Sequence, residues 1–325
     1  MVRFVGYLLP GVLALWPIEK WYLDCLLRHS ELYAACISEE IFFTTAGQFC
    51  NPFLAQIAVG VFLVQLGNLF HQIEITTRCN FSCSYCAGRS MDQQDMDWET
   101  FKAIVDGLSP QHQHCTVSLQ GEGEPSLHPL FWCMADYVTT SGHTPYSILN
   151  GSRLDAARIA ATFPRIGISL DTLDASTAER IGRHNLTKVL RNLEELTAVM
   201  SPSRITVMSV DMGQPLGPLR AWVRQRGFGR HVIQPLARKD DYARHYGTAI
   251  RFTPRRQPES AVRPSSTCRF VQSDLMRFYT WKGQELPCCF IKDTTGIESI
   301  PQLKQSLARG EVPPGCSGCS ELRPL

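Results

Sequence analysis

Short apolar runs alternate with amphipathic segments along most of the chain after residue 72. The apolar runs have the length and β-branched content of buried strands, and they fall at 73–77, 115–119, 146–149, 166–170, 204–210 and 231–234. Between them, apolar residues recur with helical spacing at 97–108, 129–140, 153–162, 175–198 (interrupted near Gly182) and 217–226. Strands that alternate with helices predict an α/β fold with a parallel sheet, here a partial (β/α)6 barrel of the TIM type. In such folds, ligands bind at the carboxyl ends of the strands.

The segments on either side of this predicted barrel domain, residues 73–236, have a different character. Residues 1–72 are mostly apolar and predict a helical N-terminal extension of unknown role. Their part 53–70 is long enough for a membrane helix, but it carries polar residues such as Gln56 and lacks flanking basic anchors. We therefore favour packing on the main domain over membrane association. Residues 237–263 are rich in Arg, Asp, Tyr and Pro and are expected to form a linker.

Residues 264–325 are interpreted as a small cysteine-rich C-terminal domain. A β-hairpin is expected around a turn at Trp281–Lys282–Gly283, because glycine follows two strand-like runs there. A short helix is expected at 299–309, and the chain then carries a Cys-X-X-Cys pair near its last residue.

The composition is that of a globular protein with a sizeable core, since 44% of the 325 residues are hydrophobic and 19% are charged. A formal net charge of +2 gives no support for nucleic acid as a partner. The thirteen cysteines are odd in number and clustered, which is unlike a disulfide framework. Thiolate clusters belong in a reducing compartment, which predicts a cytoplasmic protein. Cys115 and Cys133 fall in a predicted strand and helix and are expected in the core.

Three of the cysteines, Cys79, Cys83 and Cys86, lie at offsets 0, 4 and 7 directly after the first predicted strand. One short loop can therefore place three thiolates around a single iron–sulfur cluster. Three ligands for four irons leave one iron free to bind another molecule. A zinc site without its fourth ligand, or a chance group of core cysteines, are the alternatives.

The sequence of this loop, TTRCNFSCSYCAG, resembles the signature of radical S-adenosylmethionine (radical SAM) enzymes, and the resemblance extends over about 73–235. It implies that a 4Fe–4S cluster held by the three cysteines binds the methionine part of SAM through its open iron. It also implies that an electron from the reduced cluster cleaves SAM to a 5′-deoxyadenosyl radical, which abstracts hydrogen from a substrate.

Further residues at the predicted strand ends are similar to the SAM-binding positions of this family. The turn Gln120–Pro125 (QGEGEP) resembles a Gly-Gly-Glu motif, so Gly123 and Glu124 are expected to hold the SAM amino group, whereas Glu122 replaces the usual first glycine. The other positions implied by the resemblance are Tyr85 near adenine, Asn150 at the end of the third strand, and Ser169 and Asp171 at the end of the fourth.

A second set of cysteines occurs in the C-terminal domain. Its members are Cys268, Cys288, Cys316 and Cys319. Four thiolates are a full ligand set for an auxiliary 4Fe–4S cluster, and the pattern resembles the SPASM/twitch domains of many radical SAM enzymes, in the shorter, one-cluster form. Structural zinc is the alternative, because four cysteines in a small module suit zinc equally well. The adjacent Cys289 is a spare ligand, a packed thiol or a hydrogen-atom donor.

The resemblance implies a peptide or a sugar or cyclitol as the substrate, and an electron donor such as flavodoxin or ferredoxin. A second cluster favours an oxidation or a peptide modification, because it can accept an electron from a substrate radical. Two alternatives remain at this stage. One is an epimerase that uses Cys289 to return hydrogen, and the other is a non-catalytic module that binds zinc.

Overall fold

The computed structural model describes residues 70–108, 114–237, 239–243, 265–272 and 276–325. The predictions for residues 1–69, which include the apolar stretch starting at residue 53, lie outside the described residues. The same holds for most of the linker predicted over 237–263. In the described part of the chain, no helix is long and apolar enough to cross a bilayer.

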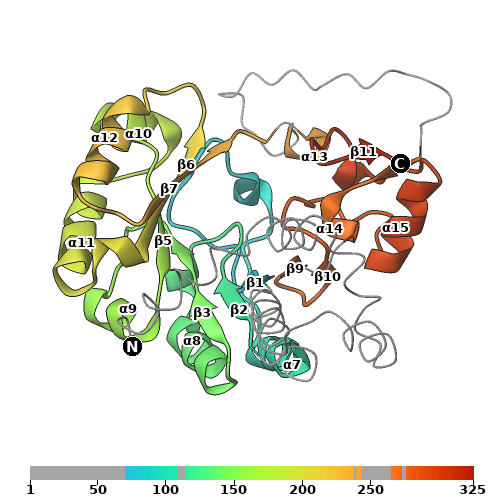
Figure 1. The fold of residues 1–325 in the computed structure, drawn as a ribbon, viewed down its shortest axis with the longest axis horizontal. Helices are drawn as coiled ribbons and strands as arrows, with labels where there is room; N and C mark the ends of the chain where they lie inside the picture. Colours follow the sequence, from blue (N-terminus) through green and yellow to red (C-terminus); the bar gives the residue numbers. More distant parts are fainter. Residues whose placement is uncertain (1–69, 109–113, 238, 244–264, 273–275) are drawn as a thin grey trace, which may run out of the picture. The chain divides into compact units, whose positions relative to one another are not determined.

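The barrel strands form two parallel sheets (Figure 1). The strands of this part are β1 (Phe70–Ile73), β2 (Thr116–Leu119), β3 (Thr144–Tyr146), β4 (Ile148–Leu149), β5 (Ile166–Ser169), β6 (Ile205–Asp211) and β7 (Arg230–Pro235). The first sheet contains β1–β2–β3 and the second contains β4–β5–β6–β7. Ser147 joins them, because its hydroxyl donates to the Leu119 carbonyl (2.6 Å) and its carbonyl accepts from the Gly167 amide (2.9 Å). The predicted partial barrel is confirmed, with its third strand divided in two.

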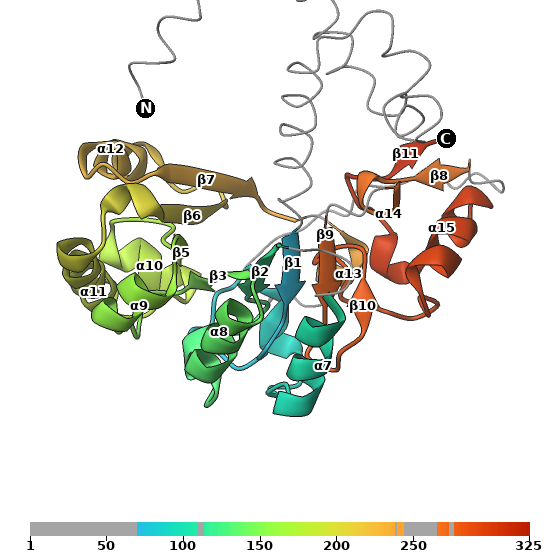
Figure 2. The ribbon, with the colours of Figure 1, turned by 60° about the horizontal axis from the view of Figure 1, so that its bottom comes forward.

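Helices follow the strands and cover the apolar face of the sheets. They are α7 (Trp98–Leu108), α8 (Phe131–Thr140), α9 (Ala156–Thr162), α10 (Ala175–Ile181), α11 (Leu186–Val199) and α12 (Gly217–Gln225). In Figures 1 and 2, α7 and α8 lie side by side next to β1–β3, where Phe101 and Phe131 join the fully buried core with Leu119. Gly182 ends α10 with φ +91°, a left-handed conformation that favours glycine, which confirms the predicted break.

Two predictions about this part are wrong. The first strand was expected over 73–77, but β1 ends at Ile73, and the Thr77 amide bonds instead to the Gln94 carbonyl at 2.9 Å. Thr76 and Thr77 are β-branched, like many strand residues, yet both lie in a loop. Cys133 is exposed rather than in the core, because the buried positions of α8 are Phe131, Met134, Ala135 and Val138, which lie on another side of the helix.

The C-terminal segment adds strands to the barrel sheet. Its elements are α13 (Asp240–Ala243), β8 (Ser266–Thr267), α14 (Arg269–Gln272), β9 (Met276–Tyr279), β10 (Glu285–Leu286), α15 (Ile300–Ala308) and β11 (Arg323–Pro324). The predicted hairpin is present, since β9 and β10 pair antiparallel and Gly283 has φ +81°. Strand β9 also pairs parallel with β1, so the first sheet runs β10–β9–β1–β2–β3 (Figure 2). Short 3-10 turns complete the described elements at Ala87–Ser90, Pro125–Leu127, Pro202–Arg204 and Pro314–Cys316.

Candidate active site

The loop of Cys79, Cys83 and Cys86 is fixed against the end of α10. The Ser82 amide donates to the Gly182 carbonyl (3.0 Å), and the Ser84 amide donates to the Ile181 carbonyl (2.8 Å). A Cβ atom on Gly182 would lie 2.2 Å from the Ser82 carbonyl oxygen, so glycine is required at this position for contact as well as for conformation.

The three thiols of this loop lie against one apolar cluster, with Cys83 buried and the other two half-buried. Burial and the neighbouring Glu122 carboxylate raise the pKa of the Cys86 thiol to about 12. Burial also raises the pKa of the Cys83 thiol, and the Cys79 thiol adds to this effect. Three thiols in one partly buried place are a donor set that fits an iron–sulfur cluster, whose positive charge would favour the thiolate form.

The glycine-rich turn Gln120–Pro125 packs directly beneath the cysteine loop. The Glu124 amide donates to the Arg78 carbonyl at 2.7 Å, and the Glu122 amide donates to the Glu74 carboxylate at 2.9 Å. At Gly123 the turn approaches the backbone of this loop closely, because a Cβ atom there would lie 2.4 Å from the Thr76 carbonyl oxygen. Glycine therefore lets this turn reach the start of the cysteine loop.

Substitution of Gly123 by alanine is expected to destabilise the fold by about 1–3 kcal/mol, because the backbone atoms that the new methyl group meets cannot turn away. Gly107, in the exposed face of α7, has nothing within 4 Å of its Cβ position. There, alanine is expected to stabilise the protein by about 0.5–1 kcal/mol. Urea denaturation of the two variants measures both values, and similar values for the two would contradict the close packing at Gly123.

Glu124 and Asn150, two of the predicted SAM-binding residues, are brought together by the structure. The Asn150 amide donates to Glu124 Oε2 (2.6 Å), and Ser126 donates to Oε1 from its amide (3.2 Å) and its hydroxyl (2.5 Å). The Asn150 side chain donates in turn to Asn80 Oδ1 (2.9 Å) and lies 3.8 Å from the Cys79 sulfur. The end of the third strand is thus joined to the cysteine loop.

Tyr85 and Asp171 also meet, and they share a partner that the sequence reasoning missed. The Tyr85 hydroxyl donates to Asp171 Oδ2 at 2.8 Å, and Arg183 forms an ion pair with the same carboxylate. Arg183 also donates to the Tyr85 hydroxyl (2.6 Å) and to the Ser169 carbonyl (3.3 Å). Since Asp171 is fully buried, a counterion was to be expected, but the sequence offered many candidates for it.

A second missed residue is Lys292, which comes from the C-terminal segment. Its ammonium group forms an ion pair with Glu122, the residue that departs from the family motif. Glu122 also accepts hydrogen bonds from the Gly88 amide (3.0 Å) and the Cys86 thiol (3.3 Å). The C-terminal segment therefore reaches the loop of the three cysteines.

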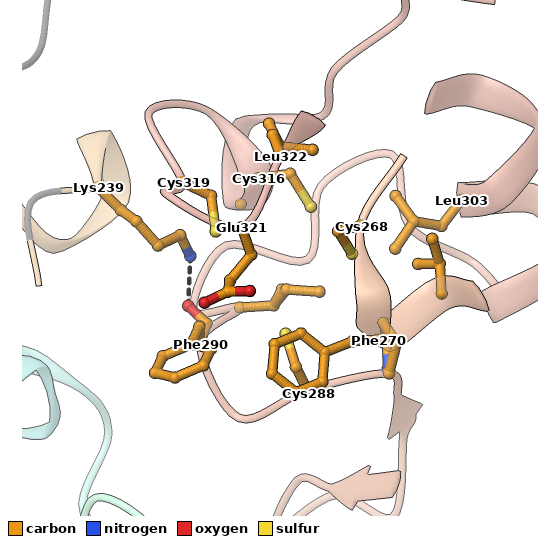
Figure 3. Close-up of a pocket in the computed structure, with 14 residues that line it drawn as sticks. Lys239, Cys268, Phe270, Cys288, Phe290, Leu303, Cys316, Cys319, Glu321 and Leu322 are labelled. Carbon is orange, nitrogen blue, oxygen red and sulfur yellow. Dashed lines mark hydrogen bonds between the residues drawn. The ribbon is translucent and has the colours of Figure 1, made fainter. Parts of the chain in front are cut away.

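The four C-terminal cysteines line a single pocket (Figure 3). The Lys239 ammonium lies at its edge, where it bonds to the Phe290 carbonyl and to Asp241 Oδ2 (3.2 Å). Burial raises the pKa of the Cys316 thiol to about 12, and the Lys239 charge opposes the increase. Four thiols beside a buried cation are a donor set that fits a second iron–sulfur cluster. Within the described ranges, no three His, Cys, Asp or Glu side chains form a group that could hold a single metal ion.

Cys289 does not line this pocket in the described part of the chain, although its neighbour Cys288 does. The charged groups that act on the Cys289 thiol include Lys292 and Glu122. Burial raises the pKa of this thiol, and Lys292 opposes the increase. The two adjacent cysteines pack on the same apolar cluster, but only Cys288 lines the pocket.

Comparison with known proteins identifies the class. Residues 73–215 match the model of the radical SAM superfamily, so the chain contains a radical SAM domain, which confirms the predicted family. The S-adenosylmethionine-dependent nucleotide dehydratase of Selenomonas ruminantium is 27% identical over 41% of this chain and 50% of its own length. The mycofactocin maturase MftC of Mycobacterium tuberculosis is 33% identical over 38% of this chain and 33% of its own length. The chain thus spans half or less of these curated relatives.

Among solved structures, SuiB of Streptococcus suis bound to S-adenosylmethionine is similar over 84% of this chain and 73% of its own, with a TM-score of 0.53. The sequence identity is 11%, so this similarity concerns the fold. SuiB bound to the precursor peptide SuiA is similar over 90% of this chain, with a TM-score of 0.52 and 12% identity.

Proposed function

We propose that the protein is a radical SAM enzyme that holds one 4Fe–4S cluster at Cys79, Cys83 and Cys86 and a second at Cys268, Cys288, Cys316 and Cys319. The first cluster would supply the electron that cleaves SAM to a 5′-deoxyadenosyl radical. The observation that carries this proposal is the convergence of three strand ends on one loop. Asn150 lies at Cys79, Glu122 lies at Cys86, and Asp171 holds Tyr85 between the second and third cysteines.

The chain's own residues would bind and orient SAM at this loop. A carboxylate has about four acceptor positions, and the hydrogen bonds to Glu124 occupy two on Oε1 and one on Oε2. One position on Oε2 is left to accept a hydrogen bond from an ammonium group. Gly123 allows the turn to approach closely, and Tyr85 provides an aromatic face that suits adenine. Ser169 and Asp171 would orient the ribose or the methionine carboxylate.

The proposed reaction is an oxidation or a peptide modification, for which Cys268, Cys288, Cys316 and Cys319 would hold the cluster that takes up the electron of the substrate radical. A peptide is one substrate class, supported by the likeness in fold to SuiB, which has been solved with its precursor peptide. A sugar or cyclitol is the other. A flavodoxin or a ferredoxin in the cytoplasm would reduce the first cluster.

Anaerobic purification with iron and sulfide analysis tests this proposal. About eight irons per chain, with broad absorbance at about 400 nm, are expected for two 4Fe–4S clusters. Reduction with dithionite in the presence of SAM is then expected to yield 5′-deoxyadenosine. Zinc without iron would overturn the proposal and support the alternative of a non-catalytic metal-binding module.

An epimerase is the second candidate, and the surroundings of Cys289 favour it. Its thiol does not line the pocket of the four cysteines in the described structure, and its backbone carbonyl accepts a hydrogen bond from Lys292, the partner of Glu122 beside the SAM-binding loop. A thiol in this place could return a hydrogen atom to a substrate radical. Products formed in deuterium oxide would carry one solvent-derived deuterium in this case and none after a simple oxidation.

A further inference from the structure

A buried ion pair joins the C-terminal segment to the SAM-binding loop. Lys292 and Glu122 are 5% and 15% exposed at their side chains, and their charged groups are in direct contact. Other groups that interact with the Lys292 charge are Glu74, Tyr242 and Cys289. A buried carboxylate without a counterion is costly, so the position of Glu122 depends on the position of Lys292.

On one side, this pair acts on the third cysteine of the loop. Glu122 Oε2 accepts from the Cys86 thiol and from the Gly88 amide, and the Glu122 carbonyl accepts from Arg89 at 2.9 Å. The backbone packing is equally close, because a Cβ atom on Gly88 would lie 2.4 Å from Glu122 Cβ. A displacement of Glu122 would therefore displace the segment that begins at Cys86.

On the other side, the pair is tied to the second set of cysteines. The Lys292 ammonium donates to the Cys289 carbonyl (2.9 Å). The backbone amide of Lys292 donates to Asp241 Oδ2 (3.1 Å). The same Asp241 oxygen accepts from Lys239, which lies beside the four-cysteine pocket. A continuous set of hydrogen bonds and ion pairs thus connects the two cysteine sites.

We propose that Lys292 is a positioning residue that, through Glu122, fixes the turn after Cys86 and supplies a positive charge to the three-cysteine site. This inference deepens the proposed function and rests on it for the cluster, while the positioning itself requires no cluster. Assembly of the C-terminal segment is thereby coupled to the geometry of the SAM-binding loop. Glu122 stands at the first position of the family motif, where glycine is usual, and a glycine there would have no side chain to pair with Lys292.

Hydrogen–deuterium exchange of the full-length protein, as purified, tests the positioning. In K292M, peptides that cover 86–91 are expected to exchange about tenfold faster, the effect of losing one hydrogen bond to a charged group. K304M, which removes an exposed lysine from α15 in the same segment, serves as the control and is expected to leave this exchange unchanged. Faster exchange around Lys292 without a change at 86–91 would overturn the proposal.

The reduction potential of the three-cysteine cluster tests the charge. K292M removes a cation and is expected to shift this potential to more negative values, whereas E122Q removes an anion and is expected to shift it to more positive values. The double variant E122Q/K292M is expected between the two. Shifts of the same sign, or none beyond that of K304M, would contradict the proposal.

The outcomes separate this inference from the proposed function. If the protein holds no iron, the proposed function fails, and the exchange experiment still decides on the positioning. If K292M does not fold, the neutral pair E122Q/K292M replaces it, because removing both charges avoids a lone buried carboxylate. Exchange at 86–91 is then expected to increase in the double variant, and wild-type exchange there would overturn the inference.

Discussion

Replacement of Cys79, Cys83 and Cys86 together by alanine is expected to abolish the formation of 5′-deoxyadenosine and to remove about half of the iron, leaving about four irons per chain. The physical reason is that one loop supplies all three thiols, while the second set lies in its own pocket between α14, the segment after β10 and the chain's last turn. Iron analysis and absorbance spectra of the anaerobic variant measure the iron, and chromatography of the reaction with SAM and dithionite measures the product.

The paired control is Cys133→Ala, since Cys133 is exposed on α8 and takes no part in either set. It is expected to retain all the iron and full SAM cleavage. Complete loss of iron from the triple variant would contradict the assignment of two separate sites. Retention of about eight irons would show that the loop is not a cluster site.

The strands and helices of the barrel could be predicted from the sequence because their signals are local. Short apolar runs predicted β5 and β6, and Gly182 marked the end of α10 because its left-handed conformation favours glycine. The hairpin of β9 and β10 was likewise visible in a glycine at its turn. In each case the deciding interaction joins residues that are close in sequence.

The pairing of β9 with β1 could not be predicted in this way, because it depends on contacts between distant segments. The same reason explains the two missed cations. A buried carboxylate such as Asp171 or Glu122 requires a counterion, but the sequence does not show which of many lysines and arginines reaches it. Motif spacing identified the cysteines and the turn, whereas the groups that hold them in place became visible only in three dimensions.

Glu122 shows how a departure from a motif can be interpreted. From the sequence, a glutamate in place of glycine weakened the match. In the structure, its backbone still bonds to Glu74 and its side chain contacts Cys86, and its charge is balanced by Lys292. The departure is therefore matched by a lysine from a distant part of the chain, which is what a buried charge demands.

Substitution of Arg183 by methionine is expected to lower the free energy of unfolding by about 3–5 kcal/mol, the usual cost of leaving one partner of a buried ion pair alone. Asp171 is fully buried and would keep hydrogen bonds from Tyr85 and the Val210 amide, but it would lose its counterion. Tyr85 would lose one of its two partners, so the loop between Cys83 and Cys86 is expected to loosen as well. Urea denaturation at neutral pH measures the change in stability.

Two further variants show whether the charge causes this loss. Arg180→Met removes an exposed arginine from the same helix end and is expected to change stability by no more than about 0.5 kcal/mol. The double variant D171N/R183M removes both charges and is expected to recover most of the loss, because no unpaired charge then remains buried. We assign Arg183 as the counterion that holds Asp171 and Tyr85 at the SAM-binding loop. A loss of less than about 1 kcal/mol in R183M would refute this assignment, and so would a double variant that is as unstable as R183M alone.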